Sequence, residues 1–211
     1  LSDSLSAKYE NMESDLKKHN LVNEKDLYEN SDFILSVGGD GTMLRTAYKA
    51  LDHNTPLIGV NIGKLGFLAE FDLDGIDELA KNLIENNYEI EERMVLKAKC
   101  ISPKQEELYA INDIVIDKGR WPKMIQLTVK VDGDYVSTFS ADGIIISTPT
   151  GSTGYSLSTG GPILSPKANA VTLSPISPHT LTMRPLVLSS EQNIEITVDS
   201  QHTSVQTNCD G

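Results

Sequence analysis

Cysteine, basic residues and long apolar runs are all scarce in this sequence of 211 residues. Neither of its two cysteines, Cys100 and Cys209, has a second Cys or a His at metal-ligand spacing, which argues against a zinc site. The 18 Lys and Arg against 30 Asp and Glu give a formal net charge of -12, which argues against a general nucleic-acid binder. No apolar run reaches membrane-spanning length and no secretory signal opens the chain, so we expect a cytoplasmic protein without membrane attachment.

The first part of the chain alternates short apolar runs with helix-forming segments. Strand, glycine turn, helix and strand in that order are typical of βαβ units with a parallel sheet. We therefore expect an α/β lobe over residues 1–87. Its predicted strands cover residues 32–37 and 56–62, and its predicted helices cover residues 9–19, 42–51 and 76–86.

From residue 88 to residue 211 the pattern changes to alternating β-branched and polar residues, which is typical of half-buried strands. The pair Asp132-Gly133 predicts a hairpin turn between two of them. We therefore expect the second lobe to be mostly β. Its predicted strands cover residues 94–101, 108–116, 125–131, 135–140, 143–146, 194–198 and 204–207.

The turn Gly38–Thr42 lies between a predicted strand and a predicted helix. Its glycines allow the backbone to approach a ligand closely and to direct N–H groups at phosphate oxygens. Asp40 is unexpected beside phosphates unless it holds a cation or takes a proton from an attacking hydroxyl. The same residues also fit a β-turn in which Asp40 merely caps the helix. This turn alone favours neither interpretation.

A segment rich in hydroxyl groups, residues 147–158, follows the predicted strand at 143–146. Its small donors and acceptors suit the sugar and phosphate oxygens of a nucleotide, and the ring of Tyr155 could stack on a base. Clusters of Ser, Thr and Gly are also common in ordinary loops. The length of the segment and the embedded tyrosine favour a binding role.

Asn112 and Asp113 interrupt the apolar alternation of the strand predicted at 108–116. Two adjacent polar residues cannot both face solvent, so one of them must be satisfied within the core or at a ligand site. A bulge or a strand end is the alternative explanation.

Four further residues are weaker candidates. Asp142 approaches a predicted strand, and Phe67 is either a core residue or a ring that packs against adenine. Arg45, expected on the first helical turn after Asp40, would be explained by a phosphate partner or be simply solvated. Lys123, beside Trp121, could contact phosphate or a neighbouring subunit, or lie at a solvent-facing hairpin tip.

These features occur together in the order that characterises NAD kinases, and the chain resembles that family over nearly all of its length. The turn Gly38–Thr42 alone is shared with lipid kinases, whereas the segment 148–162 is much more specific. The segments 61–68 and 178–187 and the pair at 112–113 complete the resemblance.

The resemblance implies the two-domain NAD kinase fold: a Rossmann-like α/β lobe over residues 1–87, a β-rich, β-sandwich-like lobe over residues 88–211, and the ligand in the crevice between them. It implies transfer of the terminal phosphoryl group of ATP, or of polyphosphate in some members, to the 2′-hydroxyl of the adenosine ribose of NAD, giving NADP. It also implies Mg²⁺ or another divalent cation as cofactor, and a homodimer or homotetramer.

Carried over by position, Asp40 is similar to the base that prepares the ribose hydroxyl, and Asn112 and Asp113 to the pair that holds ribose and adenine. Asp142 matches a carboxylate near the nicotinamide half, and residues 153–158 match the loop around the adenosine. The residues expected to contact NAD or phosphate are Asp40, Gly41, Arg45, Phe67, Asn112, Asp113, Lys123, Asp142, Thr150, Thr153, Gly154, Tyr155 and Ser158.

The sequence departs from the family pattern at several positions. Asp113 stands where a glutamate is usual, Gly154 where alanine is frequent, and Ser140 where many relatives have an arginine. Two alternatives stay open at this point. One is a lipid kinase of the diacylglycerol or sphingosine type, which would need an apolar channel for acyl chains, and the other is a dinucleotide-binding protein without turnover.

Overall fold

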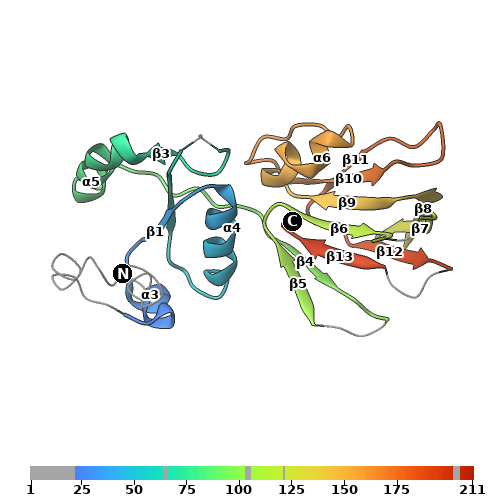
Figure 1. Cartoon of the computed structure of the whole chain (residues 1–211), viewed down its shortest axis with the longest axis horizontal. Helices are drawn as coiled ribbons and strands as arrows, with labels where there is room; N and C mark the ends of the chain where they lie inside the picture. Colours follow the sequence, from blue (N-terminus) through green and yellow to red (C-terminus); the bar gives the residue numbers. More distant parts are fainter. Residues whose placement is uncertain (1–21, 64–65, 103–105, 121, 202–204) are drawn as a thin grey trace. The chain divides into compact units, whose positions relative to one another are not determined.

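The computed structural model describes residues 22–63, 66–102, 106–120, 122–201 and 205–211. Between Ile90 and Glu91 the chain divides into two compact units (Figure 1). The helix predicted at residues 9–19 lies outside the described residues.

The first unit is built on a parallel sheet in the order β1-β2-β3. Helix α4 connects β1 to β2, which confirms the predicted βαβ unit. The sheet register pairs Ile34 with Leu57 and Val37 with Val60. The elements are α3 (Glu24–Asn30), β1 (Ile34–Val37), α4 (Asp40–Lys49), β2 (Leu57–Asn61), β3 (Phe71–Asp72), the 3-10 turn η2 (Leu73–Gly75) and α5 (Ile76–Ile84).

The turn between β1 and α4 is tight, and its packing explains the glycine at position 38. A Cβ atom on Gly38 would lie 2.6 Å from Thr42 Oγ1, so a side chain there would collide with the first turn of α4. The strand before it is only half buried, because Leu35 and Val37 are each 47% exposed. The apolar run at residues 32–37 had indicated a buried strand, which was wrong, whereas the predicted parallel pairing is confirmed.

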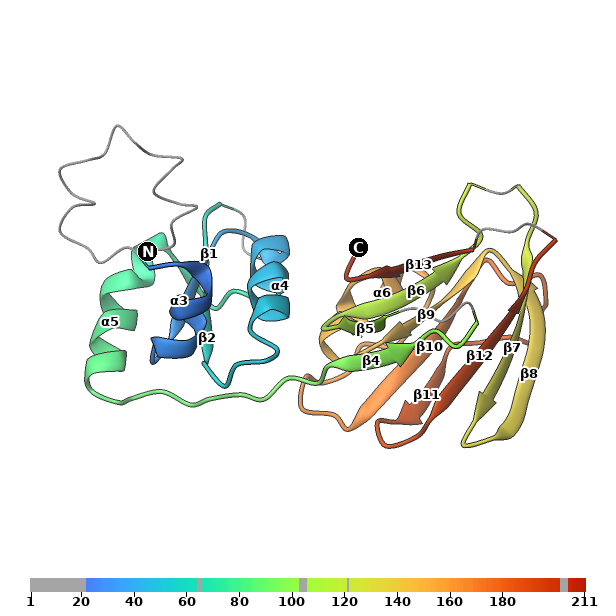
Figure 2. The same cartoon turned by 90° about the horizontal axis from the view of Figure 1, so that it is seen from below.

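The second unit is a sandwich of two antiparallel sheets, with a separate hairpin of β4 and β5 (Figure 2). One sheet has the order β11-β10-β9-β6-β13 and the other the order β12-β7-β8. The elements are β4 (Leu96–Lys99), β5 (Glu107–Ala110), β6 (Asp113–Asp117), β7 (Ile125–Val131), β8 (Asp134–Ala141), β9 (Gly143–Ser147), η3 (Thr150–Thr153), α6 (Tyr155–Ser158), β10 (Ala170–Ile176), β11 (Leu186–Ser189), β12 (Ile194–Asp199) and β13 (Gln206–Cys209).

Apolar side chains from both sheets form the core of this unit. Alternate residues of β7 point inward, and Ile125, Leu127 and Val129 are almost fully buried against Ile144 of β9 and Leu173 of β10. This is the strict alternation expected of a strand with one buried face. The prediction of a β-rich, sandwich-like lobe is confirmed.

Two local predictions have different outcomes. Asp132 and Gly133 have φ angles of 53° and 87°, as a two-residue hairpin turn requires, so that turn is confirmed. The single strand predicted at 108–116 is in fact two strands, β5 and β6, because the chain breaks at Ile111 and Asn112. The strands β3, β10 and β11 were not predicted.

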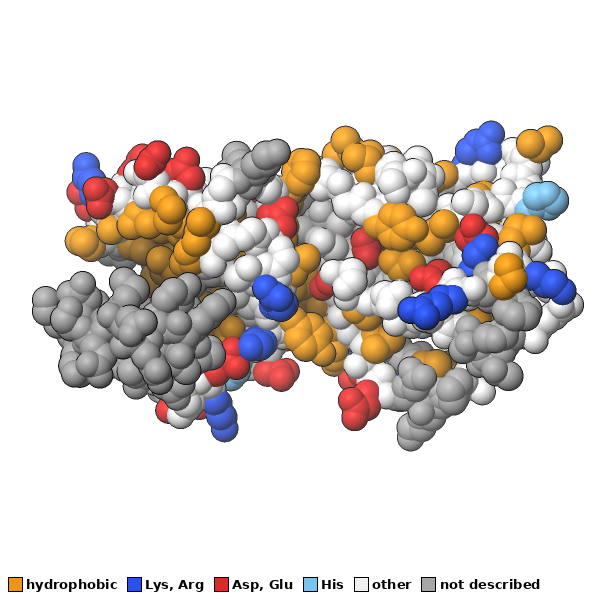
Figure 3. Space-filling view, in the orientation of Figure 1, with side chains coloured by type: hydrophobic (Ala, Val, Ile, Leu, Met, Phe, Trp, Pro, Cys, Tyr) orange, Lys and Arg blue, Asp and Glu red, His pale blue; other side chains and the backbone are white. Residues whose placement is uncertain are grey.

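Charged side chains are mixed over the surface. On the face drawn in Figure 3, the Lys and Arg side chains of the described residues are dispersed among acidic and neutral ones, without a continuous basic stripe. No helix within the described ranges is both long and apolar enough to cross a membrane.

Candidate active site

Asp40 is the first residue of α4, and its side chain binds a neighbouring loop rather than capping the helix. The N-cap residue is Gly39, which has no capping side chain. The two oxygens of the Asp40 carboxylate accept hydrogen bonds from the backbone N–H groups of Phe67 (2.9 Å) and Leu68 (3.1 Å). The interpretation of Asp40 as a helix cap was therefore wrong.

The loop after β2 passes very close to Asp40 at Gly66. A Cβ atom on Gly66 would lie 2.1 Å from Asp40 Oδ1, so this glycine is needed for the tether. The next side chain, Phe67, is 78% exposed. Its interpretation as a core residue was wrong, and the aromatic ring is free to meet a ligand.

Two other predicted residues lie on the same helix. Gly41 is exposed, and a Cβ atom placed on it would meet nothing within 4 Å, so a ligand can approach the backbone there. Arg45 is also exposed and makes no ion pair with any other described residue. It lies on the second turn of α4 rather than on the first, because the helix begins at Asp40.

In the second unit, the break between β5 and β6 is fixed by the segment that follows β9. The carbonyl oxygen of Asn112 accepts hydrogen bonds from Thr148 N (2.9 Å) and Ser147 Oγ (3.3 Å). Thr148 Oγ1 donates to the carbonyl of Ile111 at 2.6 Å. Gly151 packs so closely that a Cβ atom there would lie 2.1 Å from the Asn112 oxygen. The structure thus brings the Asn112–Asp113 pair and the hydroxyl-rich segment together.

Asp113 is buried, with 5% of its surface exposed, and its carboxylate accepts no hydrogen bond from any described residue. Burial raises the pKa of Asp113 to about 6, and the negative charge of Asp210 adds to the rise. A buried acid without a hydrogen-bond partner among the described residues is available for a hydrogen-bond donor on a ligand.

Asp210, just after β13, contacts the Asn112–Asp113 turn and was not predicted from the sequence. Its carboxylate accepts the backbone N–H groups of Ile111, Asn112 and Asp113. These partners lie 97 to 99 residues away in the chain, so no local sequence pattern could predict the contact.

The hydroxyl-rich segment folds into η3 and the short helix α6, and its side chains separate by helical spacing. Thr148, Ser152 and Ser156 are fully buried, and Ser156 Oγ lies 2.9 Å from Ser174 Oγ on β10. These hydroxyls hold the structure together, so the ordinary-loop alternative was partly correct. The positions predicted to contact a ligand are all exposed or half-buried: Thr150, Thr153, Gly154, Tyr155 and Ser158.

Gly154 places this segment against Asp113. A Cβ atom on Gly154 would lie 3.8 Å from Asp113 Oδ2, which is an ordinary van der Waals distance. The same Cβ atom would lie 3.2 Å from the backbone oxygen of Gly151, so an alanine here would require a shift of a few tenths of an ångström.

Asp142 and Lys123 lie elsewhere in the second unit. Asp142 precedes β9 and forms an ion pair with Lys118 (2.6 Å), while Asp113 pairs with Ser147 at the far end of β9. Four residue steps of a strand correspond to about 13 Å. Lys123 Nζ donates to Gln201 at 3.4 Å, and its neighbour Trp121 lies outside the described residues. The structure therefore does not bring Asp142 to the Asn112–Asp113 pair.

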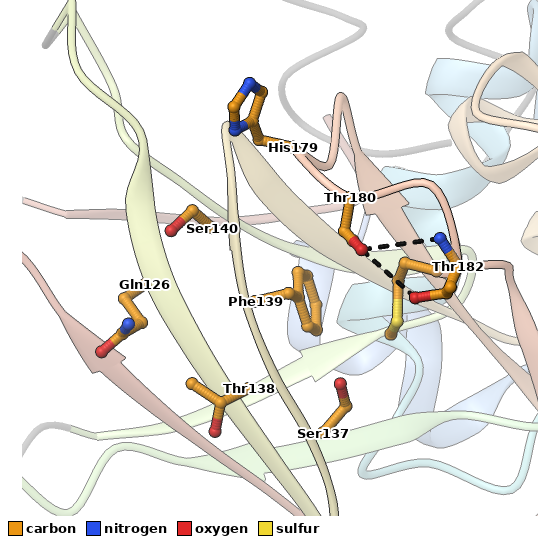
Figure 4. A pocket seen from close by; sticks show the side chains of 9 residues that line it. Gln126, Ser137, Thr138, Phe139, Ser140, His179, Thr180 and Thr182 are labelled. Atoms are coloured by element: carbon orange, nitrogen blue, oxygen red, sulfur yellow. Dashed lines mark hydrogen bonds between the residues drawn. The ribbon is translucent and has the colours of Figure 1, made fainter.

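A polar cavity of about 320 Å³ opens on β7 and β8, beside residues 179–183 (Figure 4). Ser140, the position at which many relatives carry arginine, lines it, and the backbone N–H of His179 donates to the Ser140 carbonyl at 2.8 Å. None of the predicted site residues lines this cavity.

The described residues contain no group of three His, Cys, Asp or Glu side chains arranged to share a metal ion. Mg²⁺ in phosphoryl-transfer sites is commonly held by one or two carboxylates together with the phosphates of the nucleotide. Single carboxylates such as Asp40 fit a cation shared with the nucleotide but not an all-protein cage.

Comparison with known proteins assigns each unit to one half of a two-domain nucleotide kinase family. Residues 4–88 match the ATP-NAD kinase N-terminal domain, and residues 111–211 match the ATP-NAD kinase C-terminal domain. The chain belongs to the ATP-NAD kinase family.

Individual relatives agree with this assignment. The chain is 46% identical over 189 residues to an NAD kinase of Heliobacterium modesticaldum, covering 89% of this chain and 67% of that protein. It is 45% identical over 179 residues to an NAD kinase of Protochlamydia amoebophila, covering 85% and 63%. The chain therefore spans about two thirds of the length of these relatives.

Two solved structures are similar to this fold. Yeast NADH kinase complexed with NADH has a TM-score of 0.88 and 30% identity, covering 100% of this chain and 64% of that one. An NAD kinase from Archaeoglobus fulgidus in complex with ATP has a TM-score of 0.74 and 31% identity, covering 95% and 82%. Neither a lipid kinase nor a protein without turnover is favoured by these matches.

Proposed function

We propose that this protein is an NAD kinase that transfers the terminal phosphoryl group of ATP to the 2′-hydroxyl of the adenosine ribose of NAD, giving NADP. The observation that carries the proposal is the position of Asp40, a carboxylate at the start of a helix beside open glycine backbone and an exposed phenylalanine. Helix N-termini with accessible backbone favour phosphate groups.

In this proposal Asp40 accepts the proton of the ribose hydroxyl as that oxygen attacks phosphorus. Each Asp40 oxygen already accepts one N–H from the loop at Phe67 and Leu68, which fixes the orientation of the carboxylate and leaves further lone pairs for the hydroxyl. Positioning and electrostatics are the main contributions that a protein makes to phosphoryl transfer.

The second unit would bind the adenosine half of NAD. Asn112 and Asp113 lie together beside Gly154, and the ring of Tyr155 is 47% exposed, so it can stack on a base. The buried Asp113 carboxyl would accept a hydrogen bond from a ribose hydroxyl or from the adenine amino group. Thr150, Thr153 and Ser158, on the exposed side of the segment, would offer further polar contacts.

The proposal also includes a divalent cation, an oligomeric state and further ligand contacts. We expect Mg²⁺ or another divalent cation to enter with ATP and to offset charge on the transferred group. In keeping with the resemblance, we also propose a cytoplasmic homodimer or homotetramer, with Arg45, Lys123 and Asp142 as contacts to NAD or phosphate. Polyphosphate is a second possible donor to be tested beside ATP.

The proposed activity is tested by incubating the protein with NAD, ATP and Mg²⁺ and measuring NADP, with diacylglycerol as a control acceptor. We expect NADP to form and diacylglycerol to stay unphosphorylated. Phosphorylation of the lipid instead would overturn the proposal in favour of a lipid kinase, and NAD binding without turnover would point to a dinucleotide-binding protein.

The substitution Asp40→Asn tests the proton transfer. We expect NADP formation to fall by at least about a hundredfold, because general-base catalysis commonly contributes that much. The fold and NAD affinity should be largely retained, since one side-chain oxygen still reaches the Phe67–Leu68 loop. Turnover and calorimetric NAD binding are measured together, and near-normal turnover would remove Asp40 from the mechanism.

A further inference from the structure

Three consecutive backbone N–H groups converge on one carboxylate in the second unit. Asn112 N lies 2.7 Å and Asp113 N lies 3.2 Å from Asp210 Oδ1, and Ile111 N lies 3.0 Å from both Asp210 oxygens. Successive N–H groups that point into one concavity form an anion-binding nest. Here the anion is supplied by the chain itself.

The backbone of Asp210 is held in place as well as its side chain. Its own backbone N–H donates to the Asp113 carbonyl at 3.0 Å, and its φ angle of 58° is a left-handed conformation that aspartate tolerates better than most residues. Strand β13 pairs with β6 in a register that sets Cys209 opposite Ile114, so Asp210 arrives beside Asp113 on a fixed strand.

The turn at residues 111–113 is thereby held by two independent groups. Thr148 and Ser147 bind its carbonyl oxygens, while Asp210 binds its N–H groups. Without Asp210, three partly buried N–H groups would lose their partner, which is costly for a backbone that must keep one conformation. The side chains that depend on this conformation are Asn112 and the buried Asp113.

We propose that Asp210 is a positioning residue for NAD binding, which fixes the Asn112–Asp113 turn through its N–H groups without touching the dinucleotide. The inference rests on the proposed function, because Asn112 and Asp113 are the residues assigned to the adenosine half. The negative charge of Asp210 also contributes to the raised pKa of Asp113. Replacing Asp210 should therefore weaken NAD binding and leave the phosphoryl-transfer step itself unaffected.

The test compares Asp210→Asn with the matched control Asp132→Asn. Asp132 also has a left-handed φ angle, 53°, and its carboxylate also accepts a backbone N–H from a distant residue, Asn193 (2.9 Å). It belongs to the hairpin between β7 and β8, away from the Asn112–Asp113 turn. A general loss of stability should appear in both variants. A loss of NAD affinity should appear only in Asp210→Asn.

We expect Asp210→Asn to raise the NAD dissociation constant by about tenfold, as the loss of charge-assisted hydrogen bonds implies. KM for NAD should rise in parallel, with kcat and KM for ATP within about twofold of wild type. Amide hydrogen exchange of residues 111–113 should accelerate only in this variant. Asp210→Glu keeps the carboxylate and should retain most of the NAD affinity.

Wild-type NAD affinity in Asp210→Asn, or equal losses in Asp210→Asn and Asp132→Asn, would overturn the inference while leaving the proposed function intact. A wild-type protein that binds no NAD would instead remove the proposed function, and the inference with it. If Asp210→Asn unfolds at the assay temperature, its NAD affinity is measured at a lower temperature at which the variant is folded, beside wild type and Asp132→Asn. Wild-type NAD affinity in folded Asp210→Asn would again overturn the inference.

Discussion

Asp40 has a structural role and a proposed catalytic role, and both depend on Gly66. Its carboxylate tethers the loop at Phe67 and Leu68, and in the proposed function it also accepts the ribose proton. The loop can come this close only because Gly66 has no side chain. The backbone of Phe67 and the Asp40 carboxylate are therefore held beside each other.

The substitution Gly66→Ala should displace this carboxylate. The added methyl group would lie 2.1 Å from Asp40 Oδ1, so either the loop or the aspartate must move. We expect at least about a tenfold loss of kcat/KM for NAD, because small displacements of catalytic groups are costly. In the control Gly75→Ala, the methyl group meets Phe71 at 3.5 Å, and activity should be unchanged. Wild-type activity in Gly66→Ala would show that the tether does not matter.

Asp113 gives the protein a characteristic dependence of stability on pH. Its pKa in the folded state is raised from the ordinary 3.8 to about 6, so between these values the folded chain binds more protons than the unfolded chain. Stability from this group is full below pH 3.8 and is lost as pH rises to about 6, at most about 3 kcal/mol.

Asp113→Asn should remove this dependence. We expect the stability of wild type relative to the variant to fall between pH 4 and pH 6.5 and to stay constant above, as measured by denaturant unfolding at each pH. Other titrating groups are common to both proteins and cancel in the difference. Parallel curves for the two proteins would contradict the raised pKa.

At the scale of single residues, sequence reasoning could propose Asp40, Asn112 and Asp113 as candidates because unusual residues interrupt otherwise regular patterns. It could not identify Asp210, since an aspartate after a strand is unremarkable until its partners, 97 to 99 residues away, are known. The exposure of Phe67 was equally beyond reach, because a lone aromatic residue in a loop fits a core or a binding surface.

At the scale of elements, the segment at 147–158 shows how one run of hydroxyls serves two purposes. Ser156 is fully buried and pairs with Thr172 and Ser174 of β10, whereas Ser158 is exposed and caps only the carbonyl of Tyr155. Composition alone could not separate these two groups, because the division follows the helical turn that only the fold establishes.

The matched substitutions Ser156→Ala and Ser158→Ala should therefore differ. Removing the buried hydroxyl leaves its partners unsatisfied, and we expect a loss of about 1–3 kcal/mol in unfolding free energy. Removing the exposed hydroxyl should leave stability within about 0.5 kcal/mol and weaken NAD binding instead. Chemical denaturation and calorimetry measure the two quantities, and equal destabilisation by both changes would contradict this division.

The break between β5 and β6 also exceeded what the sequence pattern could predict. Residues 108–116 are apolar enough for one continuous strand, and propensity favours such a strand. Contacts from Thr148 and Asp210, both distant in sequence, bind the backbone groups that a continuous strand would have paired. By contrast, the hairpin at Asp132 and Gly133 was predictable because its conformation depends on those two residues alone.

At the scale of the whole molecule, the two units carry different parts of the proposed work, and the periodicity of the sequence was enough to distinguish them. Parallel strands connected by helices have a different spacing of apolar residues in the sequence from antiparallel strands with one buried face. The formal net charge of -12 makes the recognition of anionic nucleotides a local matter, because no general positive field draws them in.

A ligand that binds only the folded state stabilises the protein by an amount that grows with the logarithm of the ligand concentration divided by its dissociation constant. At a hundred times its dissociation constant, NAD should add about 2.7 kcal/mol and raise the melting temperature measurably. Diacylglycerol in detergent serves as the comparison ligand. A shift with the lipid and none with NAD would contradict the proposed function.

The nest at residues 111–113 has a consequence for selectivity. Its three N–H groups would suit a phosphate, but the carboxylate of Asp210 already fills it, and Asp113 lies beside it. A free phosphate would have to displace a covalently attached competitor and approach two acids. This part of the protein is therefore closed to phosphates and open to neutral hydrogen-bond donors such as sugar hydroxyls and the amino group of a base, so the charged groups of both nucleotides must be received by other residues.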